Sequence, residues 1–109
     1  MEGHAFIHNG KGWHVERLWK LATQLETFEA DTRTFLDQLE TARWGEITGL
    51  DLLTHFHRVS HADFDHPIIL APDGHIMDGM HRLCRAFLER RETIPAVQFE
   101  RLPPCDFEE

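Results

Sequence analysis

The chain has 109 residues, of which 41% are hydrophobic, and its formal net charge at pH 7 is −8. A chain of this size and composition folds as one domain, so we expect residues 1–109 to share one modest core. The acidic excess repels a polyanion, and strong binding to nucleic acid is therefore not expected. The sequence has neither an apolar run long enough to span a membrane nor a signal-like N-terminus, so we expect a cytoplasmic protein.

Two helices are predicted in the first part of the chain. From Gly12 onward, apolar residues recur at the spacing of one helical face, which predicts an amphipathic first helix. The residues expected on its buried face are Val15, Leu18, Trp19, Ala22 and Leu25. Asp31 and Thr32 are suitable N-caps for a second helix that would end near Gly45. The residues expected on the buried face of this second helix are Phe35, Leu36 and Leu39.

A third, short helix is predicted from Thr48 to about His57. Thr48 and Asp51 have the spacing of a capping box, in which each side chain accepts a hydrogen bond from the backbone of the other. The apolar residues of this helix are Leu52, Leu53 and Phe56. His57 and His61 are four residues apart, but we expect the polar segment from Ser60 to be a loop, which would separate the two imidazoles. Together with the absence of any closed four-ligand pattern, this predicts no bound metal.

The middle of the chain has the pattern of a β-hairpin. Residues 68–70 form an apolar run that predicts a buried strand, and Pro67 is tolerated at its opening position. Residues 71–74 have the sequence Ala-Pro-Asp-Gly, in which proline presets φ and glycine tolerates a positive φ, as a β-turn requires. Residues 75–77 are then expected to return as the partner strand.

A fourth helix is expected to begin near Gly79, followed by a last strand over residues 94–99. The residues on the apolar side of this helix are Met80, Leu83, Cys84, Phe87 and Leu88. The acidic tail, residues 103–109, is expected to be loose. Helices that precede a small sheet, with one helix returning across it, predict the α+β class.

The start of the fourth helix has the chemistry of an anion site. About four backbone N–H groups lack intrahelical partners there and carry partial positive charge. Gly79 allows the backbone to approach a ligand, and Arg82 adds a fork of charged donors. Asp78 is either a plain N-cap or the candidate catalytic group, as a magnesium ligand or general base. The pattern predicts a phosphate ligand.

The order strand, turn, strand and then Gly79-x-His81-Arg82 on a helix start resembles the ParB/sulfiredoxin superfamily. The resemblance covers residues 67–99, about a third of the chain. It implies a fold in which N-terminal helices pack on a small mixed sheet and a helix follows a β-hairpin. It also implies that a nucleoside triphosphate, ATP or CTP, binds at this helix start with or without magnesium. The residues implied as ligand contacts are Gly79, Met80, His81 and Arg82, with Arg58 as a further basic candidate.

Two departures from the family pattern narrow the expectation. Met80 stands where sulfiredoxins have their reactive cysteine, and a thioether cannot form the thiolate that reductase chemistry needs. The chain also lacks the helix-turn-helix and dimerisation segments of ParB partition proteins. Cys84 and Cys105 are expected to be free thiols, Cys84 within the core.

Two functions from different classes remain open at this point. The first is a ParB-like domain that binds a nucleotide or another small phosphate ligand and, if catalytic, transfers or hydrolyses a phosphoryl group. The alternative is a non-catalytic interaction module or DNA-associated regulator with a degenerate site.

Overall fold

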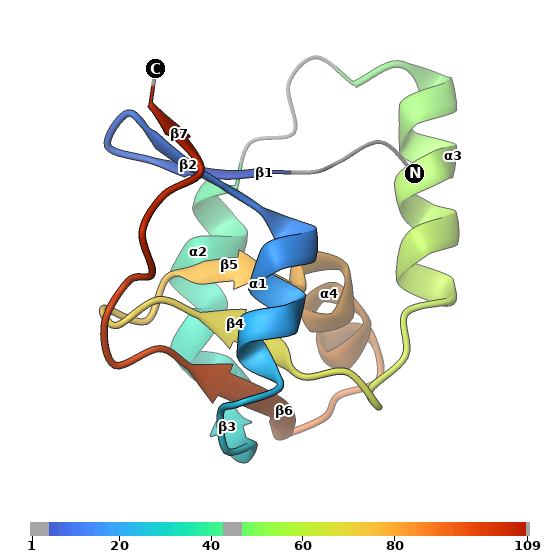
Figure 1. The fold of residues 1–109 in the computed structure, drawn as a ribbon. Coiled ribbons are helices and arrows are strands. Elements are labelled where there is room, and N and C mark those ends of the chain that lie inside the picture. Colours follow the sequence, from blue (N-terminus) through green and yellow to red (C-terminus); the bar gives the residue numbers. More distant parts are fainter. Residues whose placement is uncertain (1–4, 43–46, 109) are drawn as a thin grey trace.

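The computed structural model describes residues 5–42 and 47–108 and confirms the α+β class (Figure 1). A four-stranded sheet has the order β3-β6-β4-β5, and a three-stranded sheet has the order β1-β2-β7. The strands are β1 Ala5–His8, β2 Lys11–His14, β3 Phe28–Asp31, β4 Ile68–Leu70, β5 Ile76–Asp78, β6 Thr93–Gln98 and β7 Phe107–Glu108. The helices are α1 Val15–Ala22, α2 Leu36–Thr41, α3 Gly49–Ser60 and α4 Met80–Leu88, with a 3-10 turn Thr32–Phe35 before α2.

The four-stranded sheet is mixed and is covered on both faces. β4 pairs antiparallel with β5 and parallel with β6, and β6 pairs antiparallel with β3. Successive side chains of a strand point to opposite faces. Ile68 therefore joins a cluster with Leu83 of α4, whereas Ile69 joins a second cluster with Leu18 of α1. The predicted hairpin, with its turn closed by a Gly74 N–H to Ala71 C=O bond of 2.9 Å, is confirmed.

The described part of the chain begins with the hairpin of β1 and β2, so the expectation of helix from Gly12 onward is wrong for residues 12–14. His8 pairs with Lys11, which leaves Asn9 and Gly10 as a two-residue loop with φ of 52° and 76°. Positive φ at both positions is typical of a type I′ turn, for which Asn-Gly is the preferred sequence. The first helix starts only at Val15.

α1 buries a narrower face than predicted. Val15, Leu18 and Ala22 are buried, but Trp19 is 52% exposed. Trp19 carries an N–H group that needs a partner, and it finds one outside the core. The prediction that Trp19 lies on the buried face is therefore wrong.

The segment that leads into the second predicted helix forms a strand that was not predicted. Residues 28–31 form the edge strand β3 against β6, and Asp31 then caps the following turn by accepting a bond from the Arg33 N–H. Phe35 is buried as expected, but Leu36 is 42% exposed because the 3-10 turn rotates α2 relative to one continuous helix. The predicted end near Gly45 lies outside the described residues.

The capping box of α3 is confirmed, with a Thr48 side chain to Asp51 N–H bond and an Asp51 carboxylate to Thr48 N–H bond, both 3.1 Å. The helix runs to Ser60, and His61 still donates its N–H to the carbonyl of His57, so the expected break before His61 is wrong. The apolar residues of α3 are not buried.

The C-terminal tail is ordered by specific contacts, so the expectation of a loose tail is wrong for residues 103–108. The carbonyl of Pro103 accepts a 2.8 Å bond from the Trp13 indole, and Asp106 forms a 3.1 Å ion pair with Arg17. Short-range sequence patterns do not report such long-range partners. In the described part of the chain, no helix is both long and apolar enough to cross a membrane.

Candidate functional site

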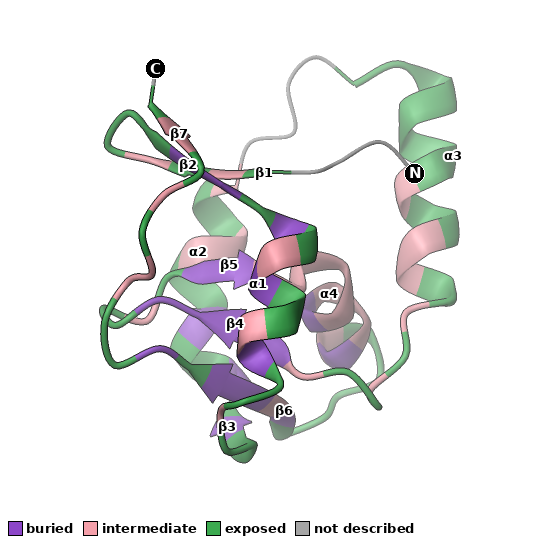
Figure 2. Ribbon diagram, viewed as in Figure 1, coloured by how far each residue is buried: buried purple, intermediate pink, exposed green. Residues whose placement is uncertain are grey.

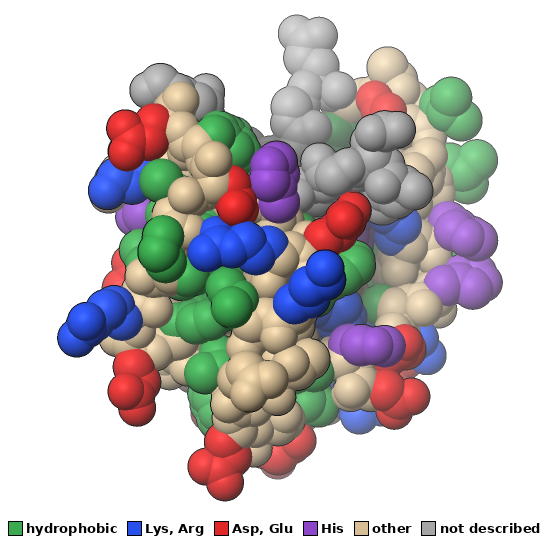
Figure 3. Space-filling view, in the orientation of Figure 1, with side chains coloured by type: hydrophobic (Ala, Val, Ile, Leu, Met, Phe, Trp, Pro, Cys, Tyr) green, Lys and Arg blue, Asp and Glu red, His purple; other side chains and the backbone are tan. Residues whose placement is uncertain are grey.

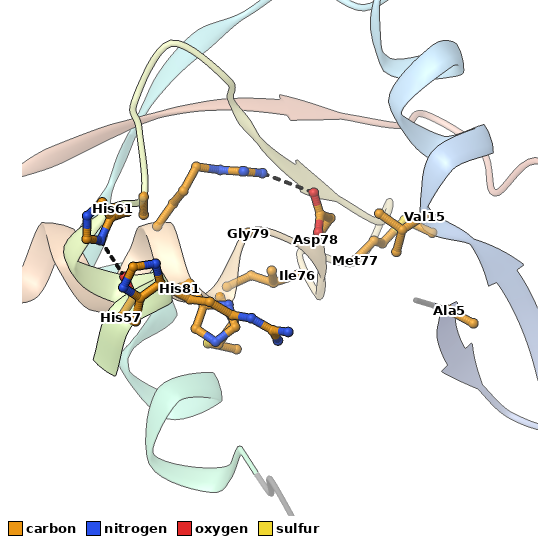
Figure 4. A pocket seen from close by; sticks show the side chains of 13 residues that line it. Ala5, Val15, His57, His61, Ile76, Met77, Asp78, Gly79 and His81 are labelled. Carbon is orange, nitrogen blue, oxygen red and sulfur yellow. Dashed lines mark hydrogen bonds and ion pairs between the residues drawn. The ribbon is translucent and has the colours of Figure 1, made fainter. Parts of the chain in front are cut away.

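All six predicted site residues line one cleft of about 580 Å³. Asp78 ends β5, Gly79 caps α4, and Met80, His81 and Arg82 form its first turn. Arg58 reaches the cleft from α3. The sequence placed Asp78 to Arg82 at one helix start and Arg58 upstream of the hairpin, and the structure brings α3 to this helix start as the facing wall of the cleft (Figure 4).

Gly79 is required for two separate reasons. Its φ is 114°, a conformation that strains any residue with a side chain. A Cβ at this position would also lie 2.5 Å from Ile68 Cγ2 and 3.1 Å from Ile68 Cα. Gly79 therefore packs the helix start directly against β4 and makes no side-chain cap.

Asp78 and Arg82 form an ion pair at the edge of the cleft. Asp78 Oδ2 accepts a 3.0 Å bond from Arg82 Nη2 and a 2.7 Å bond from Trp19 Nε1 (Figure 4 draws the ion pair). Both charged side chains are about four-fifths buried. Asp78 thus orients Arg82 and Trp19, and its Oδ1 is the oxygen outside these contacts. The role of Trp19 was missed, although an indole at the margin of an apolar helix face signals a need for an acceptor.

The guanidinium of Arg82 is only partly satisfied. Its second Nη2 contact, to the carbonyl of Pro67, is 3.3 Å long, and its buried Nε–H has no hydrogen-bond partner within the described structure. Buried donors are rarely left without an acceptor. An anion that reaches this Nε–H would satisfy the donor, and a shift of the whole side chain would exchange the ion pair with Asp78 for the anion.

The wall formed by α3 carries a cation, Arg58, that has no counterion among the described residues. Arg58 is half-buried and makes no hydrogen bond or ion pair with any residue in the described part of the chain. Among the described residues that line the cleft, Asp78 offsets Arg82, and Arg58 leaves a net positive charge. An acidic protein thus holds one locally cationic concavity.

Three imidazoles line the same cleft. His57 and His61 have ring centroids 4.1 Å apart, and His61 Nδ1 lies 3.0 Å from the carbonyl oxygen of His57 (Figure 4). His81 Nε2 lies 3.0 Å from His55 Nδ1, which joins the start of α4 to α3. One nitrogen of this last pair must donate and the other accept, so both cannot carry a proton. Within residues 5–42 and 47–108, no three His, Cys, Asp or Glu side chains gather as a metal site.

Arg82 separates this cleft from a second cavity of about 510 Å³. The second cavity lies between α1 and the segment that enters β4. Its lining residues are Trp19, Ala22, Thr23, Leu25, Thr27, His66, Pro67, Ile69 and Arg82. The half-exposed Trp19 and the aliphatic side chains make it a mainly apolar space of the size that small molecules occupy.

Cys84 lies one turn into α4 and is half-buried. Burial raises the pKa of the Cys84 thiol, which disfavours the thiolate that nucleophilic chemistry needs. Cys84 is therefore poorly suited to act as a nucleophile.

Comparison of the chain with protein-family models, with curated proteins and with solved structures finds no match.

Proposed function

We propose that this chain is a ParB/sulfiredoxin-like domain that binds a nucleoside triphosphate, or a related phosphate ligand, at the start of α4. The observation that carries the proposal is Arg58, which has no partner among the described residues and lines the cleft opposite a helix start whose N-cap, Gly79, has no side chain. A helix start and a facing guanidinium together supply the donors and the positive field that phosphate oxygens require.

The residues have distinct expected roles. Backbone N–H groups of Met80, His81 and Arg82 hold one phosphate group, which approaches closely because Gly79 has no side chain. Arg58 contacts the same anion from α3, and Arg82 contacts it after exchange with Asp78. The apolar cavity beyond Arg82 can take the base, with Trp19 as its aromatic wall.

Magnesium would have few protein ligands in this arrangement. Mg²⁺ prefers oxygen ligands and often binds through one carboxylate and substrate phosphates. Asp78 Oδ1 is the carboxylate oxygen of the cleft that is not already bonded to Trp19 and Arg82. If phosphoryl transfer occurs, positioning and charge neutralisation are what these residues contribute.

Calorimetric titration with ATP, CTP, GTP and pyrophosphate, each with and without magnesium, tests the proposal. We expect Arg58→Ala to weaken binding by at least about tenfold and Arg82→Ala by about 1.5–3 kcal/mol, the scale of a charge-assisted hydrogen bond. Arg101→Ala is the matched control, because Arg101 is exposed and lines neither cavity. Equal affinity for the wild type and the Arg58 variant contradicts the proposal, as does a lack of heat with every ligand.

A sulfiredoxin activity is not expected. Met80 occupies the position of the nucleophile, and the Cys84 thiol is half-buried on the helix. ATP-dependent reduction of a peroxiredoxin sulfinic acid by this protein would contradict this assignment.

A further inference from the structure

One carboxylate oxygen joins the two cavities. Asp78 Oδ2 accepts a 3.0 Å bond from Arg82 Nη2 and a 2.7 Å bond from Trp19 Nε1. Asp78 lines the cleft, Trp19 lines the second cavity, and Arg82 lines both. A movement of Arg82 in the cleft is therefore transmitted to Trp19 in the second cavity through a single shared acceptor.

Trp19 is the least packed member of this group. It is 52% exposed, although Leu18 beside it is completely buried. Figure 2 shows buried and exposed residues along α1, in front of the buried strand β4. The bond to Asp78 holds the indole N–H in place. The position of this aromatic wall thus depends on how strongly Asp78 accepts.

An anion in the cleft competes with Asp78 for Arg82. The buried Nε–H of Arg82 has no acceptor among the described residues, and an anion supplies one. When Arg82 turns to the anion, Trp19 is the donor of the two that stays on Asp78 Oδ2. The bond between Trp19 and Asp78 then strengthens, because the carboxylate is no longer shared with a cation. The same movement releases the carbonyl of Pro67, which also lines the second cavity.

We propose that an anion in the cleft and an aromatic ring in the second cavity bind with positive cooperativity, coupled through Arg82, Asp78 and Trp19. The inference rests on the proposed function, in which the phosphate groups and the base occupy these two spaces. A ring that stacks on Trp19 must order a half-exposed side chain. An anion that has already strengthened the bond between Trp19 and Asp78 removes part of that cost. Each occupant must raise the affinity of the other by the same factor.

The coupling favours a ligand that carries both groups. Pyrophosphate has no ring, and a nucleoside has no anion, so each makes only the contacts of its own cavity. A nucleotide makes both sets of contacts and gains the coupling in addition. Figure 3 shows hydrophobic and basic side chains next to one another on the face that α1 occupies, which suits a ligand of this kind.

Calorimetric titration of adenosine and of cytidine, each alone and at saturating pyrophosphate, tests the proposal. Pyrophosphate should raise the affinity for at least one nucleoside about fivefold or more, the lower end of the usual range of coupling. Trp19→Phe keeps an aromatic ring but removes the N–H, and Asp78→Asn removes the charge that holds Arg82. In both variants the ratio of the two affinities should fall to about one, since no coupling remains.

Thr23→Val is the matched control. Thr23 lines the second cavity, but its hydroxyl bonds to the carbonyl of Lys20 and to Gln24, outside the coupled group. This variant should keep the wild-type ratio. Because each ratio is taken within one variant, a change in its basal affinity does not enter the comparison.

The Nε1–H signal of Trp19, assigned with the Trp19→Phe variant, gives an independent readout. Pyrophosphate alone should move this signal downfield as the bond to Asp78 shortens, although Trp19 does not line the cleft. Pyrophosphate that binds without moving this signal or raising a nucleoside affinity would overturn the coupling and leave the phosphate site standing. Coupling that Trp19→Phe retains would overturn it as well. A protein that binds no pyrophosphate would contradict the phosphate site and the coupling together.

Discussion

The two helices that border the cleft are held in place by different means. α4 buries Leu83 and Ala86 completely, and Gly79 brings its first turn against β4. α3 buries no residue and contacts α4 through polar side chains such as His55. The cleft therefore has one wall fixed by packing and one wall fixed by a cap and hydrogen bonds. A wall of the second kind opens at lower free energy than a wall fixed by packing.

The largest expected effect concerns the start of α4. Gly79→Ala combines a strained φ with a Cβ clash against Ile68, so we expect a loss of about 4 kcal/mol in unfolding free energy. Gly74→Ala is the matched control, because its φ is 91° but the space around its Cβ is open. The control should lose only about 1–2 kcal/mol. Urea denaturation of both variants measures the difference. Equal losses of unfolding free energy would contradict a packing role for Gly79.

The next largest expected effect is a difference in stability between two truncated leucines, one on α4 and one on α3. Leu83→Ala leaves a cavity in the core and should cost about 3 kcal/mol. Leu53→Ala on α3 should change the stability by less than about 0.5 kcal/mol. Thermal denaturation compares them, and a large loss for Leu53→Ala would show that α3 is packed more tightly than its exposure indicates.

A smaller, local effect is expected at the cap of α3. Thr48→Ala removes one half of the capping box and should cost about 1 kcal/mol of helix stability. Since α3 is attached through few apolar contacts, hydrogen exchange of its amides should accelerate about fivefold, while the amides of α4 are unchanged. Equal acceleration in both helices would mean that they open as one unit.

The smallest effect concerns acid. The Thr48 backbone N–H, followed by its side chain, holds the pKa of Asp51 below its ordinary value of 3.8. A carboxyl with a lowered folded pKa stabilises the fold above its unfolded pKa, and this contribution is lost as pH falls through the folded pKa. We expect α3 to fray below about pH 4. Asp51→Asn should remove that dependence from α3 amide exchange, and an identical pH profile in the variant would contradict the assignment.

The parts of the fold that the sequence predicted depend on neighbouring residues. Ala71 to Gly74 close their own turn, and Thr48 and Asp51 satisfy each other, so four-residue patterns were enough. The Asn9-Gly10 hairpin had an equally local signal that the helical period of the following residues obscured. By contrast, β3 and β7 exist because of partners far along the chain, which no local pattern reports.

The candidate site likewise has one part that the sequence predicted and one part that it did not. Gly79, His81 and Arg82 were found together because they are adjacent on one helix start. Their opposite wall and the Trp19 contact to Asp78 depend on how α3 and α1 pack, and periodicity placed Trp19 on the wrong side. The sequence thus predicted the cleft residues at the start of α4. Of the opposite wall, on α3, it predicted only Arg58.

The most direct test of the proposed phosphate site is a nuclear magnetic resonance titration of the ¹⁵N-labelled chain with ATP and CTP, with and without magnesium. The account predicts that at least one nucleotide shifts the amides of Gly79, Met80 and His81 in a saturable way, together with the Nε1–H signal of Trp19. The Gly74 turn, which lines neither cavity, should not respond. A set of shifts that leaves the start of α4 unchanged, or no shift at millimolar nucleotide, would contradict the account.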